Sequence, residues 1–366
     1  MRCVRWRRPW IPEILCNKVY HERRYILTCL FLFVLGSVLY FHVHDFGLTY
    51  LDDAAIIAES ANKFAADGSS LFLVFTRNII AGLQPYAYYR PLYAASFMLN
   101  SAFCGRDLAG YYFTNIALHI AASCLIFTLL LRLGYRHASA FMLAVLHTVH
   151  PMLTQAVAWL PGRSDTLLTI FAISSFLAFI KFSEKPGLSN YSLHILFLFL
   201  ALLSKESALG IIVLCFLYSR LILRRGLFFS GESWLLAGWL AAVWWFFLRQ
   251  GAMVNPMHMP VPDMLRFITA NSIVVIQYIG RIFFPFNLSV WPTIQDSRSA
   301  YGAAAILIIA VLLAFSKNAR RDYVVFGASW FILFIIPTLI RQYGRAPENL
   351  PSSLITGFTC RLPGLP

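Results

Sequence analysis

Two adjacent acids, Asp52 and Asp53, stand between two strongly apolar stretches of the chain. Like charges on neighbouring residues repel and are costly to desolvate, so such a pair needs water, a cation or a metal ion beside it. The preceding apolar run, residues 26–44, is about long enough to cross a bilayer, which places the pair just beyond a membrane face. This position indicates chemistry on a molecule presented at that surface. A solvated helix start explains the pair equally well, because acids favour the first turn of a helix.

Cations that suit an anionic ligand occur at two later places. In the segment YYRPL, Arg90 precedes a proline, which holds it extended and leaves its guanidinium able to grip a phosphate or a carboxylate. A snorkelling side chain at an interface is the alternative. Lys205 and Glu206 interrupt the apolar run 193–223 at a helical-hairpin turn. Their chemistry would suit anchoring an anionic head group, although the turn alone explains their position.

The segment HTVHPMLTQAVAWLPGRSD carries four further polar residues of interest. His147 and His150 share a helix face at i, i+3, but no third ligand follows at a useful spacing. Hydrogen bonding or proton handling is therefore favoured over zinc. Arg163 and Asp165 begin the next predicted helix, where a GR turn is expected to bring the guanidinium to the outer surface. An ion pair between them is the alternative.

A polar stripe crosses one of the apolar stretches. Asn115 and His119 lie at i, i+4 on one helix face, with Tyr111 one turn earlier. Polar groups inside a membrane are costly and usually face a bundle interior or a cavity, so a functional role is the default interpretation. Hydrogen bonding between helices is the structural alternative.

Composition sets the class of protein that must position these groups. The chain is 59% hydrophobic and 13% charged, whereas a soluble chain carries about a quarter charged residues. Its net charge of +14 resides in short basic clusters between apolar runs, which membrane topology explains, so nucleic acid is not expected as a partner. Seven cysteines show no CxxC spacing and predict neither structural zinc nor an essential disulfide.

Basic clusters also orient the chain. The basic segment 1–25 predicts a cytoplasmic amino terminus and an uncleaved signal anchor, with a signal peptide as the alternative. The other clusters alternate so that most acids fall on the outer side. About nine transmembrane helices are predicted from the apolar runs. They cover residues 26–44, 111–133, 138–160, 164–182, 190–204, 207–223, 233–249, 301–316 and 323–340.

Two apolar stretches do not fit as spans. Residues 71–104, within the outer loop 45–110, are interrupted by Arg and Pro and predict interfacial helices. Residues 267–284 predict an interfacial or re-entrant helix, because a span there would move the last basic cluster outside. The expected fold is an all-α polytopic membrane protein with one domain over 26–340. An outer carboxyl-terminal tail, 341–366, looks shortened or altered.

The order of several motifs resembles a known family. LDDAAI, YYRPL, GYYFTNIALH, HPMLTQAVAWLPGRSD and LLSKES follow one another over residues 48–210. This combination resembles the membrane half of the transmembrane, tetratricopeptide-containing O-mannosyltransferases and their bacterial relatives, and more broadly the GT-C glycosyltransferases. The chain departs from the family pattern at Gln155, where a glutamate is usual. No tetratricopeptide repeats follow, and IPTLIRQYGRAPENLPSS is only loosely similar to the family's ERYxYxPS segment.

The resemblance implies a GT-C-like bundle that moves a hexose, such as mannose, from a polyprenyl-phosphate donor to an acceptor hydroxyl. The acceptor would be a protein, a glycan or a lipid, and the site would face the extracytoplasmic side. Asp52 would be the general base, with inversion, and Asp53 would orient the acceptor or hold a divalent metal. Donor-phosphate binding would fall to Arg90, Arg163 and Lys205, with support from Asn115, His119, His150, Asp165 and Glu206. A bacterial inner membrane is favoured over the endoplasmic reticulum.

Two other classes of function fit a polytopic, basic chain. In a transporter, Asn115 and His119 would line the path, but two related halves with broken helices would be expected and are not found. A noncatalytic membrane scaffold leaves the acid pair and the outer arginines without a role.

The predicted topology has a direct test. Reporters fused after Arg136 and after Asp165 should give opposite signals, because the intervening span carries the chain from the cytoplasmic to the outer side. Equal signals would refute the topology and the outward-facing site with it.

Overall fold

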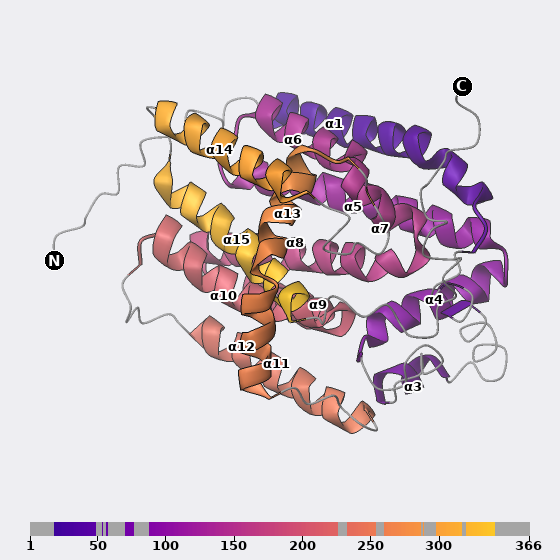
Figure 1. The fold of residues 1–366 in the computed structure, drawn as a ribbon. Helices are drawn as coiled ribbons and strands as arrows, with labels where there is room; N and C mark the ends of the chain where they lie inside the picture. The colour runs from indigo at the N-terminus through magenta and orange to yellow at the C-terminus, as the bar shows by residue number, and fades with distance from the viewer. Residues whose placement is uncertain are drawn as a thin grey trace.

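The computed structural model describes residues 18–48, 53, 56–57, 70–76, 88–225, 233–253, 260–286, 288, 298–316 and 320–340. Asp52, the segment 1–17 and the predicted tail 341–366 lie outside these residues. The described chain folds into helices, and no strand occurs among those residues (Figure 1). The predicted all-α class is therefore confirmed.

The helices follow the apolar runs closely. Short 3-10 segments, η2 to η5, occur at Phe41–Asp45, Pro151–Leu153, Leu160–Gly162 and Glu206–Leu209, and a π-helical segment, η6, at Tyr218–Ile222. The α-helices are α1 (Lys18–Tyr40), α3 (Ser70–Thr76), α4 (Pro91–Cys104), α5 (Leu108–Arg132), α6 (His137–Val149), α7 (Thr154–Ala158), α8 (Arg163–Glu184), α9 (Leu188–Ser204), α10 (Gly210–Leu217), α11 (Ser233–Ala252), α12 (Val261–Ala270), α13 (Ser272–Phe283), α14 (Ser299–Phe315) and α15 (Arg321–Leu339).

Several helices are long and apolar enough to cross a membrane. Among the described residues four qualify by length and composition, Glu22–Asp45, Leu108–Arg132, Leu160–Glu184 and Arg321–Leu339, and a fifth if α6 and α7 form one bent span. The chain is thus a multi-pass membrane protein. The predicted count of about nine exceeds this number and stays a prediction. Helices α9 and α14 are apolar but shorter, and the run 207–223 is divided among η5, α10 and η6.

The predicted third span is bent by 52° between α6 and α7. Pro151 begins the intervening η3 turn, because proline lacks the N–H that a continuous helix would need. The Nδ1 atom of His150 accepts a hydrogen bond from the Met152 amide at 3.2 Å and so caps the new turn. This bend sets the direction in which the chain reaches Gly162 and enters α8.

Helix α8 packs against both α5 and α9 at the centre of the bundle. The core between α8, η6 and α15 is aromatic: the ring of Phe176 lies 5.9 Å from that of Phe326 and 5.4 Å from that of Trp330. Phe176 also contacts Tyr218 of η6 edge-to-face at 5.2 Å. Burial of these large rings holds α15 against α8.

The two stretches predicted to be interfacial differ from each other. Helix α4 packs against α5, α8 and α9, and eight of its fourteen residues are buried, because it carries polar groups that the bundle interior uses. Residues 267–284 are divided at Asn271 into the 10-residue α12 and the 12-residue α13, each shorter than the ~20 residues of a span. These two helices run across the direction of α8 and α9 (Figure 1).

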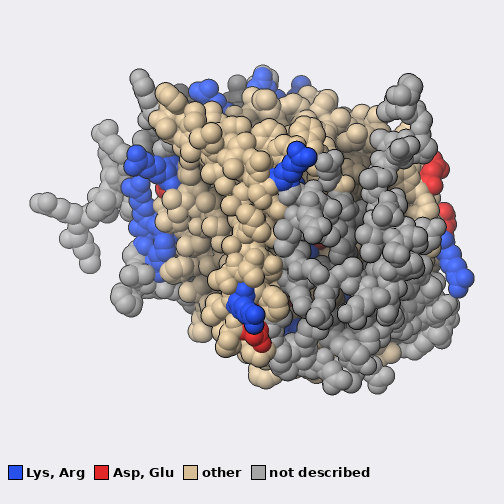
Figure 2. Space-filling view, in the orientation of Figure 1, with Lys and Arg blue, Asp and Glu red and all other residues tan. Residues whose placement is uncertain are grey.

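Charge is unevenly distributed along the bundle. Figure 2 shows Lys and Arg gathered at the left end of the molecule, the end at which α14 is followed by α15 in Figure 1. Most of the described surface between this basic end and the opposite end is uncharged in this view, and many large apolar side chains of the helices are exposed, as a chain surrounded by lipid requires. The arrangement agrees with a cytoplasmic basic end, which the reporter experiment tests.

A glycine contact at the crossing of α13 and α14 gives a stability prediction. A Cβ on Gly302 would collide with the carbonyl oxygen of Ile276, whereas a Cβ on Gly327 of α15 would meet nothing within 4 Å. Gly302→Ala should lower the free energy of unfolding by about 1–3 kcal/mol, because backbone must move. The control Gly327→Ala should be neutral or stabilise by up to about 1 kcal/mol. Thermal unfolding in detergent measures both, and equal melting temperatures would contradict the close packing.

Candidate functional site

Four of the predicted site residues converge in one cluster of charges, called here the ion-pair quartet: Arg90, Asp165, Lys205 and Glu206. Arg90 donates to Glu206 through two bonds, Nε to Oε2 at 3.1 Å and Nη2 to Oε1 at 2.6 Å. Lys205 forms an ion pair with Asp165. The quartet joins the start of α4, the first turn of α8 and the turn between α9 and η5.

Local sequence places each of these charges. Arg90 is the N-cap of α4, and Pro91 fixes the helix start directly after it. Lys205 ends α9 in an extended conformation, with φ −161° and ψ 140°, and Glu206 begins η5. Asp165 lies in the first turn of α8, where the helix dipole favours a negative charge. The predicted turn at Lys205 and Glu206 is thus present and carries half of the quartet.

The two ion pairs differ in strength. The Arg90 and Glu206 side chains are 18% and 35% exposed, those of Lys205 and Asp165 22% and 58%. Burial raises the pKa of Glu206, but Arg90 outweighs it and holds that pKa below its ordinary value. The exposed Asp165 makes the second pair weak, since exposed pairs contribute at most about 1 kcal/mol. An anionic ligand can therefore displace Asp165 from Lys205 more readily than it can displace Glu206 from Arg90.

Arg90 keeps donor capacity for a ligand. Glu206 engages one edge of its guanidinium, Nε and Nη2, which leaves Nη1 as a further donor. The guanidinium carbon lies 4.3 Å from the centre of the Tyr88 ring, which is half exposed. This contact and the bidentate pair hold the fork in a fixed orientation at the surface.

Arg163 is not at the outer surface, contrary to the sequence-based expectation. Its side chain is fully buried, and Phe97 stacks on it with 4.0 Å between the guanidinium carbon and the ring centre. The guanidinium bonds to neutral acceptors only among the described residues: Asn115 Oδ1 (2.7 Å), Asn100 Oδ1 (2.6 Å), Tyr111 O (3.0 Å), Ser96 O (3.2 Å) and Ser96 Oγ (3.4 Å). The alternative pair with Asp165 does not form, since Asp165 binds Lys205.

The polar stripe on α5 faces the bundle interior, as predicted. Asn115 is fully buried; it accepts from Arg163 and donates to the carbonyl oxygens of Val157 at 3.3 Å and Leu160 at 3.5 Å. The Nε2 atom of His119 lies 3.1 Å from the carbonyl oxygen of Thr148. Both residues therefore bond to other helices, the arrangement that the structural alternative expects.

His147 and His150 contact different groups in the structure. The ring of His147 stacks on that of His119 at 5.1 Å, and its Nδ1 lies 3.0 Å from the Ser123 hydroxyl. His150 points elsewhere: since its Nδ1 accepts from Met152, its Nε2 carries the proton and donates to Ile282 O at 2.9 Å. No group of three His, Cys, Asp or Glu side chains suited to a metal occurs in the described part of the chain. Hydrogen bonding is what these histidines do, as expected.

The acid segment packs on the same end of the bundle as the quartet. Asp53 is fully buried, and Ile56 and Ile57 are 3% and 5% exposed. Ile56 and Ile57 pack in one cluster with residues of α4 and α5, among them Tyr93, which is one helical turn from Arg90. A merely solvated helix start does not describe Asp53. Asp52 itself is outside the described residues.

Sequence reasoning missed the partners of Arg163. Ser96 and Asn100 lie at i, i+4 on the largely apolar helix α4, the same spacing that drew attention to Asn115 and His119. That spacing was a usable signal, but the segment was interpreted as interfacial. A buried contact between Ser175 Oγ and His194 Nδ1, at 2.9 Å between α8 and α9, was also missed.

Fold and site together define a multi-pass, all-helical membrane protein with an ion-paired cluster at one end. No family model and no solved structure matches the chain. It is similar to the protein O-mannosyl-transferase Tmtc1 of Drosophila melanogaster, with 29% identity over 182 residues, which are 50% of this chain and 21% of the relative. The protein O-mannosyl-transferase TMTC2 of Homo sapiens is 30% identical over 159 residues, 42% of this chain and 19% of the relative.

A third relative is the protein O-mannosyl-transferase F38B6.6 of Caenorhabditis elegans, 30% identical over 165 residues, 43% of this chain and 23% of the relative. The chain thus spans about a fifth of the length of these relatives. The similarity supports the resemblance that the motifs carry. All three come from animals, so the expected preference for a bacterial inner membrane has no support from them.

The Arg163 network gives a second stability prediction. Arg163→Lys should lower the free energy of unfolding by roughly 3 kcal/mol or more, because one ammonium cannot serve acceptors on α4 and α5 and buried polar groups lose partners. Arg136→Lys is the matched control, since Arg136 is exposed and makes no side-chain cap. Melting temperatures in detergent measure both. An unchanged value for Arg163→Lys would show that the network is dispensable.

Proposed function

We propose that this chain is a membrane glycosyltransferase of the GT-C type. It transfers a hexose, mannose by analogy with the names of its relatives, from a polyprenyl-phosphate donor to a protein hydroxyl on the extracytoplasmic side. The observation that carries the proposal is the ion-pair quartet: four charges from three separate motifs meet at the end of the bundle where the acid segment packs.

The acid pair supplies the base in this proposal. The acceptor hydroxyl must lose its proton as it attacks the anomeric carbon, and a carboxylate within hydrogen-bond reach can take that proton. Asp52 has this role. Asp53, which is fully buried and lies close enough to Tyr112 of α5 to interact with it electrostatically, orients the acceptor. Direct displacement by the acceptor inverts the anomeric centre.

The quartet supplies the cations for the leaving group. Polyprenyl phosphate gains negative charge as the sugar departs, and positive groups fixed beside it lower the barrier. The quartet carries two positive and two negative charges, so a phosphate must displace an acid to gain an unopposed cation. Lys205 exchanges the exposed Asp165 for the phosphate, while Glu206 keeps Arg90 aligned and Nη1 of Arg90 adds a second bond. Arg163 acts on this site by positioning α4 and α8, and it does not touch the donor.

Asn115, His119 and His150 take a supporting place in the same scheme. Asn115 shares the Arg163 network, and His119 and His150 fix the chain around the bend between α6 and α7. A transporter would need Asn115 and His119 to line a path, whereas both side chains bond to protein atoms. The enzyme interpretation therefore accounts for more of the observed contacts.

The proposed base has a direct test. Asp52→Asn should reduce transfer from polyprenyl-phosphate mannose to a hydroxyl-bearing peptide by about 10²- to 10⁴-fold, roughly 2.7 to 5.4 kcal/mol of barrier, because the amide keeps the shape and loses the basicity. Released polyprenyl phosphate is the measured product. Asp53→Asn should cost less if Asp53 orients the acceptor, and as much as Asp52→Asn if the pair holds a divalent metal.

The matched control is Asp107→Asn. Asp107 is exposed and caps α5 by accepting from the Ala109 amide at 3.1 Å, a role that asparagine also fills. Its transfer rate should stay near that of the wild type. Full activity in Asp52→Asn would remove the catalytic assignment, and absence of transfer in the wild type would favour the transporter and scaffold alternatives.

A further inference from the structure

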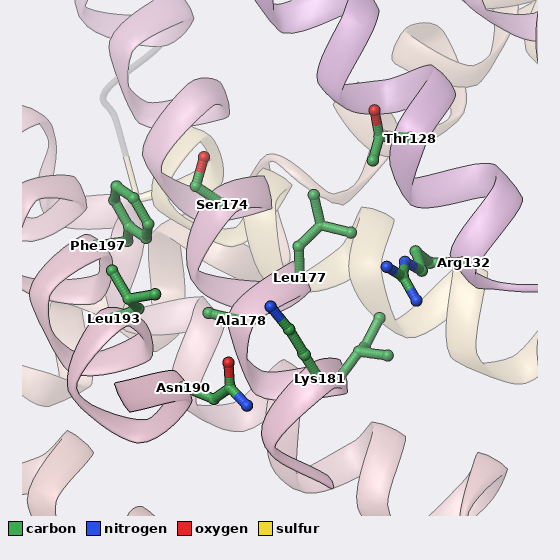
Figure 3. Close-up of a pocket in the computed structure, with 10 residues that line it drawn as sticks. Thr128, Arg132, Ser174, Leu177, Ala178, Lys181, Asn190, Leu193 and Phe197 are labelled. Atoms are coloured by element: carbon green, nitrogen blue, oxygen red, sulfur yellow. The ribbon is translucent and has the colours of Figure 1, made fainter. Parts of the chain in front are cut away.

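A cavity of about 280 Å³ lies between the ends of α5 and α8 and the start of α9, away from the proposed active site. Two cations line it, Arg132 in the last turn of α5 and Lys181 in the last turn of α8. Figure 3 shows their charged ends on either side of Leu177, with the amide of Asn190 beside Lys181. Within the described residues neither cation has an ion-pair partner, so the cavity is positively charged and uncompensated.

The other walls of the cavity are apolar. Leu177 and Ala178 line it from α8, and Leu193 and Phe197 from α9. Free phosphate has no hydrocarbon group to contact this apolar wall. A diacyl lipid would use both halves, because it joins a phosphate to hydrocarbon chains. The combination of two cations with an apolar wall is therefore complementary to a phospholipid with net negative charge.

The cavity lies at the opposite end of α8 from the quartet, where the head groups of the other membrane leaflet are expected. Asp165 of the quartet and Lys181 of the cavity are sixteen residues apart on one helix, which is about 24 Å of rise. The hydrocarbon core of a bilayer is about 30 Å thick, and the long Lys181 side chain extends beyond the helix toward the head groups, so charges at the two ends of α8 reach opposite head-group regions. The cavity thus faces the leaflet at the basic end of the bundle, away from the leaflet that the quartet faces.

We propose that this cavity binds an anionic phospholipid of that leaflet. The phosphate lies between Arg132 and Lys181, Asn190 hydrogen-bonds the head group, and one acyl chain follows Leu193 and Phe197 along α9. The site is independent of the proposed transfer reaction, since it shares no residue with the quartet or the acid segment.

Native mass spectrometry of the purified chain, titrated with phosphatidylglycerol or with phosphatidylcholine of the same acyl chains, tests this proposal. The wild type should retain phosphatidylglycerol in preference. Arg132→Gln/Lys181→Gln should weaken that binding about 25-fold, roughly fivefold for each cation removed, and should leave phosphatidylcholine binding unchanged. The charge-matched control is Arg136→Gln/Lys185→Gln, which removes two exposed cations near the same end that do not line the cavity. It should change the affinity less than twofold.

A second variant tests the cavity without altering charge. Ala178→Trp fills the space beside Lys181 and should weaken phosphatidylglycerol binding while both cations remain. Thermal unfolding of each variant establishes that it is folded before binding is compared. Equal losses in the two double variants would reduce the effect to diffuse surface attraction and overturn the proposal. So would unaltered binding in Ala178→Trp, or displacement of the lipid by millimolar inorganic phosphate, which would indicate a free-phosphate site.

Discussion

The burial of Arg163 among neutral acceptors is the constraint on which this bundle depends. A guanidinium is costly to remove from water unless its N–H groups find partners, and among the described residues no carboxylate lies within ion-pair distance. The partners come from α4 and α5, so these helices and α8 must meet in one arrangement. Asp165 follows two residues later on α8, and Arg90 begins α4. The network thereby fixes the frame in which the ion-pair quartet forms.

Cations of this chain fall into two kinds according to what surrounds them. Arg163 is enclosed and saturated, and it serves the fold. Arg90 and Lys205 are paired with acids but remain near the surface, where a pair is weaker and an anion can compete. The difference is one of burial and is not visible in residue type. It explains why only part of a set of basic residues drawn from neighbouring motifs is suited to binding a phosphate.

Periodicity and apolar length located the helices, because burial in lipid demands long runs of apolar residues whatever their partners. The family resemblance implied one site for Arg90, Arg163 and Lys205, with Asp165 and Glu206 in support, but it did not give the pairing. The sequence suggested Asp165 with Arg163, and the structure pairs Asp165 with Lys205. Pairing depends on which side chains face one another across helices. For the same reason Ser96 and Asn100 of α4 were missed, and α4 was expected at the interface.

The central claim is that Lys205 leaves Asp165 to hold the donor phosphate. The most direct test exchanges the two charges in the variant Asp165→Lys/Lys205→Asp and measures thermal stability together with donor affinity. The exchange keeps an ion pair but moves the cation from the α9 turn to α8. If Lys205 holds the phosphate, the double variant should be as stable as the wild type but should fail to bind polyprenyl-phosphate sugar. Wild-type stability together with wild-type donor affinity would contradict this claim, because the ion pair would then act in either orientation and Lys205 would have no specific role.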